Sequence, residues 1–195
     1  MGRKLSFCKD DALAKARDMF GRRGYEKTCM RDVANELSVP VASLYHSFGD
    51  KNALLTASLE AFFEGTVKPK MLALAAAEHP MAAIEAHFAG LIECYSNPEN
   101  TARGCVMLHA AGDLVEQVPE AARLAKQMMK FSREQFMAAI ERGQELGEIT
   151  RVHDAEFLSA HLMANVIAIK TWLRMGATVD RLQNYTRQAL AILRP

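Results

Sequence analysis

Apolar residues recur three or four positions apart through every long segment of this chain, and this spacing restricts its fold more than any other feature. In the first such segment, Leu13, Ala16 and Phe20 follow the pattern. Residues at these spacings lie on one face of an α-helix, whereas a half-buried strand needs apolar and polar residues in alternation. No stretch alternates for long enough to predict a strand. The chain is therefore predicted to be all-α.

Glycine and proline indicate where the predicted helices begin and end. Gly24 should end the first helix, Thr28 is expected to cap the second, and Pro40, with its fixed φ, is expected to start the third. Pro69 should kink or divide a long fourth helix. The predicted helices span approximately residues 10–23, 28–37, 41–48, 51–77, 81–96, 105–116, 120–146, 155–175 and 180–193.

Composition limits the classes of protein that are open to this chain. Half of its 195 residues are apolar, which is enough to bury a sizeable core. No apolar run approaches the roughly 18 to 20 residues that cross a bilayer, and the start of the chain lacks the apolar region of a secretory signal. We therefore expect a cytoplasmic protein with no membrane partner. Its four cysteines form no CxxC pair, so a disulfide framework is not expected.

Charge is distributed unevenly along the chain. Residues 1–51 carry 10 Lys and Arg against 7 Asp and Glu, whereas the remaining residues carry 14 against 16. A basic first part favours an anionic partner there, although three charges are a weak signal.

The stretch "VPVASLYHSF", residues 39–48, gathers small and hydrogen-bonding side chains on a segment of barely two turns. Two short helices joined by a short turn, the second preceded by Pro40, are typical of a helix-turn-helix. Its second helix can enter a DNA major groove, where one edge must lie close to the bases. Leu44 and Phe48, four residues apart, should face inward. A surface α-hairpin without DNA binding is the alternative interpretation.

The outward side chains of this segment fit two kinds of contact with DNA. Val41 and Ala42 are small enough for close approach and can meet a thymine methyl group. Ser43, Tyr45 and His46 supply hydrogen-bonding groups for phosphates or base edges.

Residues 12–55, "ALAKARDMFGRRGYEKTCMRDVANELSVPVASLYHSFGDKNALL", resemble the N-terminal domain of TetR/AcrR transcriptional regulators. The resemblance rests on Phe20-x-x-x-Gly24-Tyr25, Thr28, Asp32-Val33-Ala34, Ser43-Leu44-Tyr45, Phe48 and Lys51. It implies a homodimeric, all-α repressor that binds a double-stranded DNA operator. A helix-turn-helix domain would span residues 6–66, with the reading segment at about 29–48. Residues 67–195 would then bind an effector and a second subunit.

The resemblance also implies individual roles. Thr28, Ser43, Tyr45 and Lys51 match positions that typically touch phosphate, while Pro40, Val41, Ala42 and His46 lie where bases are read. Val41-Ala42 stands where many relatives have Lys-Gly, and Ser47 replaces a common His. The operator sequence of relatives therefore does not transfer to this chain.

Cys105 is the candidate sensor of an electrophile or oxidant. "ARGCVMLHAAGDL", residues 102–114, resembles a Gly-Cys segment of one group of these regulators. A helix N-terminus favours the thiolate, and His109 lies four residues on, on the same helix face. The alternative interpretation is that Cys105 is a small, unreactive side chain packed in a helix. A thiol enzyme using Cys105 and His109 is the rival function, but the sequence offers no evident third orienting group, so no enzyme is expected.

A small organic effector is the other candidate signal. Its pocket would be apolar with a few polar groups, although residues at helical spacing are first of all core. The predicted effector residues, besides Cys105 and His109, are Phe88, Met107, Phe136, Asn165 and Trp172. His87 with Cys94, and Cys105 with His109, could in principle hold a metal, but neither spacing is a familiar zinc signature. We therefore expect no metal and no cofactor.

Residues of about 153–194 are expected to pair with a second subunit across a two-fold axis, or else to be ordinary core. The candidate interface residues are Phe157, Leu158, His161, Leu162, Val166, Ile169, Leu182, Tyr185, Ala189 and Ile192.

Overall fold

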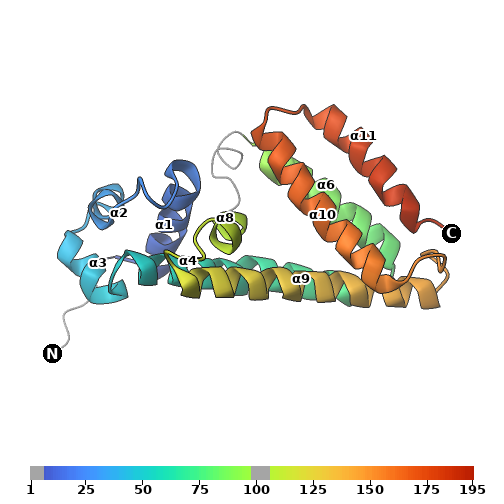
Figure 1. Ribbon diagram of the computed structural model, residues 1–195, viewed down its shortest axis with the longest axis horizontal. Coiled ribbons are helices and arrows are strands. Elements are labelled where there is room, and N and C mark those ends of the chain that lie inside the picture. Colours follow the sequence, from blue (N-terminus) through green and yellow to red (C-terminus); the bar gives the residue numbers. More distant parts are fainter. Residues whose placement is uncertain (1–6, 98–105) are drawn as a thin grey trace. The chain divides into compact units, whose positions relative to one another are not determined.

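The computed structural model describes residues 7–97 and 106–195, and within these ranges all regular elements are helices (Figure 1). The predicted all-α class is thereby confirmed. The chain forms two compact units, Met1–Gly65 with Arg103–Met128, and Thr66–Ala102 with Met129–Pro195. The expected division placed everything after residue 66 in one domain. In the structure the segment that ends at Met128 instead packs with the N-terminal helices, because its apolar residues join their core.

The first unit begins with α1 (Lys9–Arg23), α2 (Met30–Leu37), α3 (Val41–Phe48) and α4 (Lys51–Phe62). It also contains α8 (Val106–Gly112) and the start of α9 (Pro119–Glu145). These helices begin and end within a few residues of the predicted positions, except that α8 stops earlier than expected. Gly24 ends α1 with a φ of 82°, in the region that favours glycine.

The turn between α1 and α2 differs in detail from the prediction. Cys29, not Thr28, is the N-cap of α2: its backbone N–H donates to Asp32 Oδ2 at 2.8 Å, and its sulfur accepts from the Asp32 N–H. Thr28 is fully buried, and its hydroxyl donates to the Gly24 carbonyl at 2.9 Å. Thr28 therefore closes the turn instead of capping the helix.

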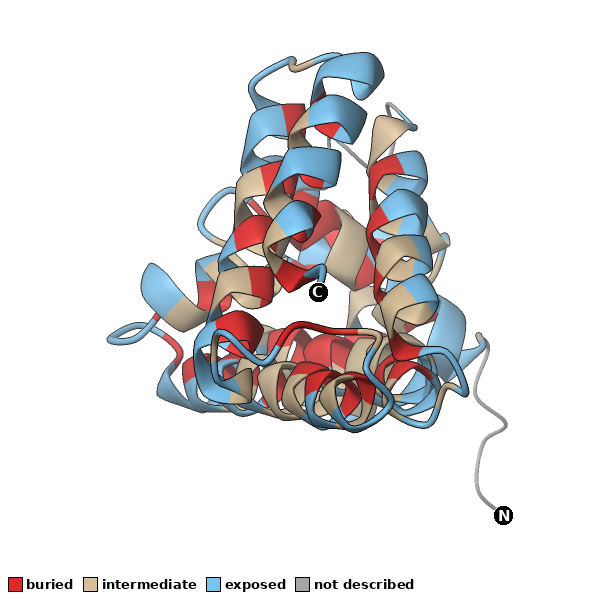
Figure 2. Ribbon diagram, turned by 90° about the vertical axis from the view of Figure 1, so that its right-hand side faces the viewer, coloured by how far each residue is buried: buried red, intermediate tan, exposed pale blue. Residues whose placement is uncertain are grey.

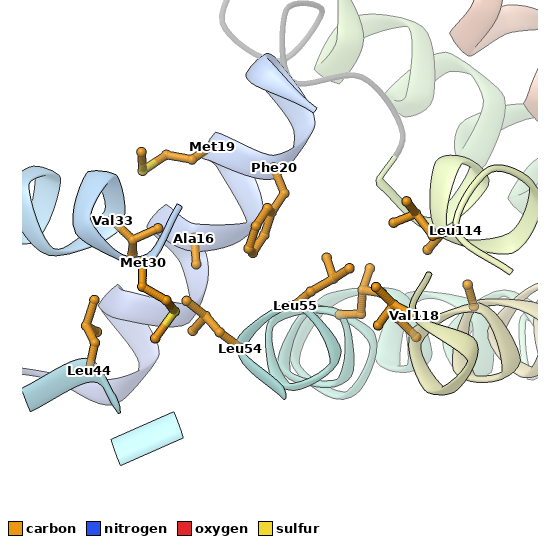
Figure 3. Close-up of a cluster of buried hydrophobic side chains, with 14 of the residues drawn as sticks. Ala16, Met19, Phe20, Met30, Val33, Leu44, Leu54, Leu55, Leu114 and Val118 are labelled. Carbon is orange, nitrogen blue, oxygen red and sulfur yellow. The ribbon is translucent and has the colours of Figure 1, made fainter. Parts of the chain in front are cut away.

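One apolar core holds the first unit together (Figure 3). Leu44 of α3, Leu54 and Leu55 of α4 and Ala16 of α1 are all completely buried. Leu114 and other apolar residues of the later segment join the same cluster, opposite Leu55 in Figure 3. Burying a leucine side chain stabilises a fold by about 1.5–3 kcal/mol, so these contacts explain why the later segment belongs to this unit.

The second unit consists of α5 (Lys68–Ala75), α6 (Pro80–Ser96), the rest of α9, α10 (Ala155–Arg174), α11 (Val179–Leu190) and the short η2 (Ala191–Leu193). Buried residues run in bands along its helices, as the amphipathic spacing predicts (Figure 2). The long fourth helix is divided as expected: α4 gives way to a π-helical turn, η1 (Phe63–Val67), and Pro69 lies in the first turn of α5.

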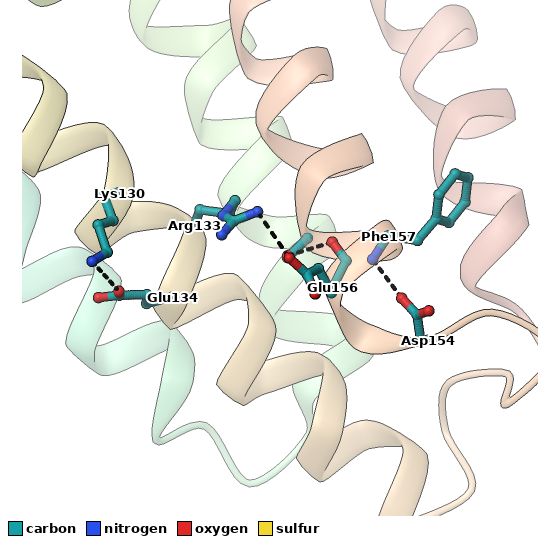
Figure 4. A network of polar contacts seen from close by, with 7 residues as sticks. Lys130, Arg133, Glu134, Asp154, Glu156 and Phe157 are labelled. Carbon is teal, nitrogen blue, oxygen red and sulfur yellow. Dashed lines mark hydrogen bonds and ion pairs between the residues drawn. The ribbon is translucent and has the colours of Figure 1, made fainter.

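Carboxylates order the start of α10 and its contact with α9 (Figure 4). Asp154 is the N-cap, and its Oδ1 accepts from the Phe157 N–H at 2.7 Å. Glu156 lies 3.8 Å from Arg133 of α9, in an exposed ion pair. Exposed pairs contribute little, so the cap is the stronger of the two contacts.

Glu148, on the turn after α9, caps α6 from a distance of 67 positions in the sequence. Its Oε2 accepts from the Met81 N–H at 3.2 Å, and its Oε1 lies 3.0 Å from His79 Nδ1. The hydrogen bond to Glu148 raises the pKa of His79 above 6.5, and the same contact, followed by the Met81 N–H, lowers the pKa of Glu148 below 4.5. The carboxylate of Glu148 thus links the turn after α9 to the start of α6, through His79 and the Met81 N–H.

This pair predicts a pH-dependent contribution to stability. The raised His79 pKa contributes fully below 6.5 and is lost as the pH rises through the folded value, while the lowered Glu148 pKa contributes fully above 4.5 and is lost on acidification. Glu148→Gln should therefore lower the free energy of unfolding more at pH of about 5.5 than at about 8.5. Urea denaturation at both pH values measures this. In a His79→Gln background the difference between the two pH values should disappear, and its persistence there would contradict the assignment.

Candidate DNA-reading helix and effector site

The reading helix α3 is anchored on one side and open on the other. Leu44 is fully buried, whereas Ala42 and His46 are exposed and Tyr45 is 52% exposed. Gly49, with a φ of 81°, ends the helix after two turns. A short helix with one buried anchor and an exposed edge of small and polar side chains has the form that a major groove accepts.

The other predicted contact residues have mixed surroundings. Pro40 is exposed as the N-cap of α3, and Val41 and Ser43 are half-buried at its first turn. Thr28 does not fit the prediction. Its side chain is 0% exposed and its hydroxyl is bonded to Gly24, so the expected phosphate contact by this hydroxyl is corrected to a structural role.

Lys51 is the first residue of α4, directly after the turn that ends the reading helix. Asp50 is the N-cap, and its Oδ1 accepts from the Ala53 N–H at 2.8 Å. The Lys51 ammonium lies 3.9 Å from the centre of the Tyr25 ring. The Tyr25 hydroxyl donates to the Asn52 side-chain oxygen. Sequence reasoning noted Tyr25 only as part of a motif and missed this contact, because a separation of 26 positions carries no local signal.

Two of the predicted effector residues meet in the core of the second unit. The rings of Phe88 on α6 and Phe136 on α9 are stacked, with centroids 6.2 Å apart, and both side chains are buried. His87 presents its ring edge-on to both, at 5.8 and 5.3 Å. Burial, followed by the charges of Lys170 and Lys70, lowers the pKa of His87 to about 4. From sequence, His87 is a candidate only for metal binding, with Cys94.

Asn165 and Trp172 of α10 face α11 instead. The Asn165 Oδ1 accepts from the Tyr185 hydroxyl at 2.6 Å, and its Nδ2 donates to the His161 carbonyl at 2.8 Å. The Trp172 ring lies 5.1 Å from the Tyr185 ring. The amide of Asn165 is therefore occupied in joining two helices.

Met107 and His109 belong to the first unit, so the predicted effector residues are divided between the units. Met107 packs against the core of the first unit. His109 Nδ1 lies 2.9 Å from Oδ2 of Asp113, which directly follows α8, in an exposed contact. Cys105 lies outside the described residues.

Within residues 7–97 and 106–195, no three His, Cys, Asp or Glu side chains are grouped so that they could hold a metal ion. Across the same ranges, no helix combines the length and apolarity needed to cross a bilayer.

The fold and the reading helix define an all-helical DNA-binding regulator of the helix-turn-helix class. Two family models match the chain: bacterial regulatory proteins of the tetR family over residues 12–58, and the tetracyclin repressor-like C-terminal domain over residues 80–190. The second covers more than half of the chain. The protein therefore belongs to the TetR family of transcriptional regulators, as the resemblance had indicated.

Curated relatives extend over nearly the whole chain. An uncharacterized HTH-type transcriptional regulator of Bacillus subtilis, YezE, is 27% identical over 99% of this chain and 100% of its own length. The HTH-type transcriptional repressor ComR of Escherichia coli is 24% identical over 98% of this chain and 91% of its own. Both matching families consist of regulators, and no enzyme family is among them.

Solved structures show the same fold. A TetR-family regulator from Agrobacterium tumefaciens aligns with a TM-score of 0.85 and 18% identity, over 95% of this chain and 97% of that one. A cysteine mutant of the regulator CifR, complexed with a 26-bp double-strand operator DNA, aligns with a TM-score of 0.80 and 21% identity, over 97% and 98% of the two chains.

The surroundings of His87 predict a neutral imidazole. Its folded pKa of about 4 lies below the ordinary 6.5, so the unfolded chain takes up this proton first and the folded state loses stability as the pH falls through that range. NMR titration of the imidazole resonances should give a value near 4, and His87→Phe should reduce the loss of stability between these pH values. An imidazole that titrates near 6.5 would contradict the buried, aromatic environment.

Proposed function

We propose that the protein is a transcriptional repressor that binds a palindromic operator as a homodimer and is released by a small molecule or by modification of a thiol. The exposed edge of α3, held in place by the buried Leu44, carries this proposal. A two-fold dimer presents two such helices to half-sites about 34 Å apart, which requires a palindromic operator. The family and the fold support regulation of transcription, and the operator, assembly and signal are proposed here.

In this proposal, contacts with phosphates provide affinity for DNA, and contacts with base edges provide sequence specificity. Ser43, Tyr45 and Lys51 contact phosphates in this proposal, because they lie at the half-buried or exposed margin of α3 and at the start of α4. Base edges are read from the first turn and outer edge of α3. The proposed reading residues are Pro40, Val41, Ala42 and His46.

Substitutions should separate these two roles. Tyr45→Ala and Lys51→Ala should weaken binding to operator and unrelated DNA alike, and Lys51→Ala should reduce the salt dependence by about one phosphate contact per subunit. Val41→Lys should change which operator is preferred. Fluorescence anisotropy over a salt series measures both effects, with Lys126→Ala, an exposed lysine on α9, as the control. Unchanged affinity in both Tyr45→Ala and Lys51→Ala would remove the proposal.

The proposed dimer surface lies on α10 and α11. Four of the residues named from sequence as either interface or ordinary core are fully buried in the second unit's own core: Leu158, Leu162, Ile169 and Leu182. Large apolar side chains nevertheless remain exposed on or beside these helices, with Phe157 at 49%, Met175 at 79% and Val179 at 37%. A second copy of the chain would remove such surface from water.

Assembly can be tested by placing charge on this surface. Phe157→Glu with Met175→Glu should convert a dimer to monomers and weaken operator binding, because a buried carboxylate without a partner is costly. Light scattering at micromolar concentration measures the mass. Val152→Glu is the matched control, since Val152 is equally apolar and 81% exposed but lies before α10. A wild-type monomer that still binds palindromic DNA one subunit at a time would contradict the dimer.

Two features support a chemical signal. His109 of α8 pairs with Asp113, which directly follows the helix, and in this proposal the imidazole of His109 activates the thiol of Cys105. The rings of His87, Phe88 and Phe136 pack together inside the second unit, and in this proposal an organic molecule enters between the helices beside them. The first favours an electrophile acting at Cys105, and the second favours a small-molecule effector.

These signals are separated by measuring DNA release. N-ethylmaleimide and hydrogen peroxide should release operator DNA from the wild type and from Cys94→Ser, whose cysteine is exposed on α6. Cys105→Ser should hold DNA under the same treatment, because the thiolate is the reacting group. Release that survives in Cys105→Ser would exclude this thiol as the sensor and leave the small-molecule effector.

A further inference from the structure

The Tyr25 ring lies where the turn after α1 meets the start of α4. Its ring stacks on Phe20 with centroids 5.9 Å apart, and its hydroxyl donates to the Asn52 side chain. The Lys51 ammonium lies 3.9 Å from the ring centre, well within the range of a cation–π interaction. One side chain thus binds two consecutive residues of α4.

The position of Lys51 is costly for α4 itself. The N-terminus of a helix carries partial positive charge, so a cation in its first turn is unfavourable. Asp50, as the N-cap, already satisfies the Ala53 N–H. The stability of α4 therefore gives no reason for a lysine at this position. An anion arriving from solvent, in contrast, would be attracted by the Lys51 ammonium and by the partial positive charge of the helix N-terminus.

The geometry of the ring contact leaves the ammonium free to bind another group. An ammonium has three N–H donors, and contact with a ring face leaves donors that can point to a phosphate. A solvated lysine loses much rotamer freedom when it binds, and a side chain already held against a ring loses less.

We propose that Tyr25 is a positioning residue for DNA binding, which holds the Lys51 ammonium in place for a backbone phosphate. This inference rests on the phosphate contact proposed above for Lys51. Asn52 and Phe20 have supporting parts, because the hydrogen bond and the ring stacking keep the Tyr25 ring in its orientation. Tyr25 itself makes no contact with DNA in this proposal.

A double-mutant cycle on the 195-residue chain tests this proposal. Tyr25→Leu should weaken binding to a fluorescent double-stranded DNA by about two- to fivefold for each contacting subunit. In a Lys51→Met background the same Tyr25→Leu change should have no further effect. Tyr25→Phe, which keeps the ring, should bind within about twofold of wild type. An equal loss in both backgrounds would show a purely structural role, and a Tyr25→Phe variant as weak as Tyr25→Leu would show that the hydroxyl acts and not the ring contact with Lys51. Either result would overturn the proposal.

Two outcomes keep this inference separate from the proposed function. If Lys51→Met binds DNA as the wild type does, over a full salt series, the phosphate contact itself fails. If Lys51→Met weakens binding but Tyr25→Leu adds its effect independently, only the positioning role fails.

An NMR measurement on the wild-type protein tests the same contact without depending on the folding of any variant. The Lys51 ε-methylene protons should resonate upfield of ordinary lysines because they lie over a ring, and the shift should persist in the complex with DNA. Ordinary shifts in the free protein, or loss of the upfield shift on DNA binding, would overturn the proposal.

Discussion

The burial of Leu44 is the contact on which the reading surface depends. A helix of two turns is too short to be stable alone, so α3 exists because its one fully buried side chain packs with Leu54 of α4 and Met30 of α2. That anchor also decides which side chains face outward. Ala42, Tyr45 and His46 are exposed because Leu44 is not, so the same anchor sets the edge that we propose reads DNA.

Polar contacts satisfy the backbone N–H groups at helix starts, which apolar packing cannot satisfy. Helix starts carry unsatisfied N–H groups, and carboxylates meet several of them in residues 7–97 and 106–195. Asp32, Asp50 and Asp154 are local caps, but Glu148 reaches the start of α6 from the turn after α9. The Glu148 contact therefore orients one helix relative to another within the second unit, in addition to capping a helix.

Aromatic rings contact a basic side chain in each unit, but one of these side chains is charged and the other is neutral. In the first unit the Tyr25 ring holds the Lys51 ammonium at the surface, where a charge stays hydrated. In the second unit, His87 lies edge-on to Phe88 and Phe136, and its burial, followed by the charges of Lys170 and Lys70, lowers the pKa of this imidazole to about 4. Similar rings thus favour a charged group at the surface and a neutral one in the core, because solvent access differs.

The sequence by itself determined the all-α class, the two short helices of the helix-turn-helix and the division of the long helix at Pro69, because helical spacing, glycine and proline act on neighbouring residues. The TetR resemblance was equally local, since its motif lies within about 45 residues. Only the tertiary structure decided that Thr28 is buried and that Leu158 and Leu182 are core. It also placed the segment before Met128 with the N-terminal helices and set Tyr25 against Lys51. Burial and partner choice depend on residues far apart in the chain, and no local pattern contains that information.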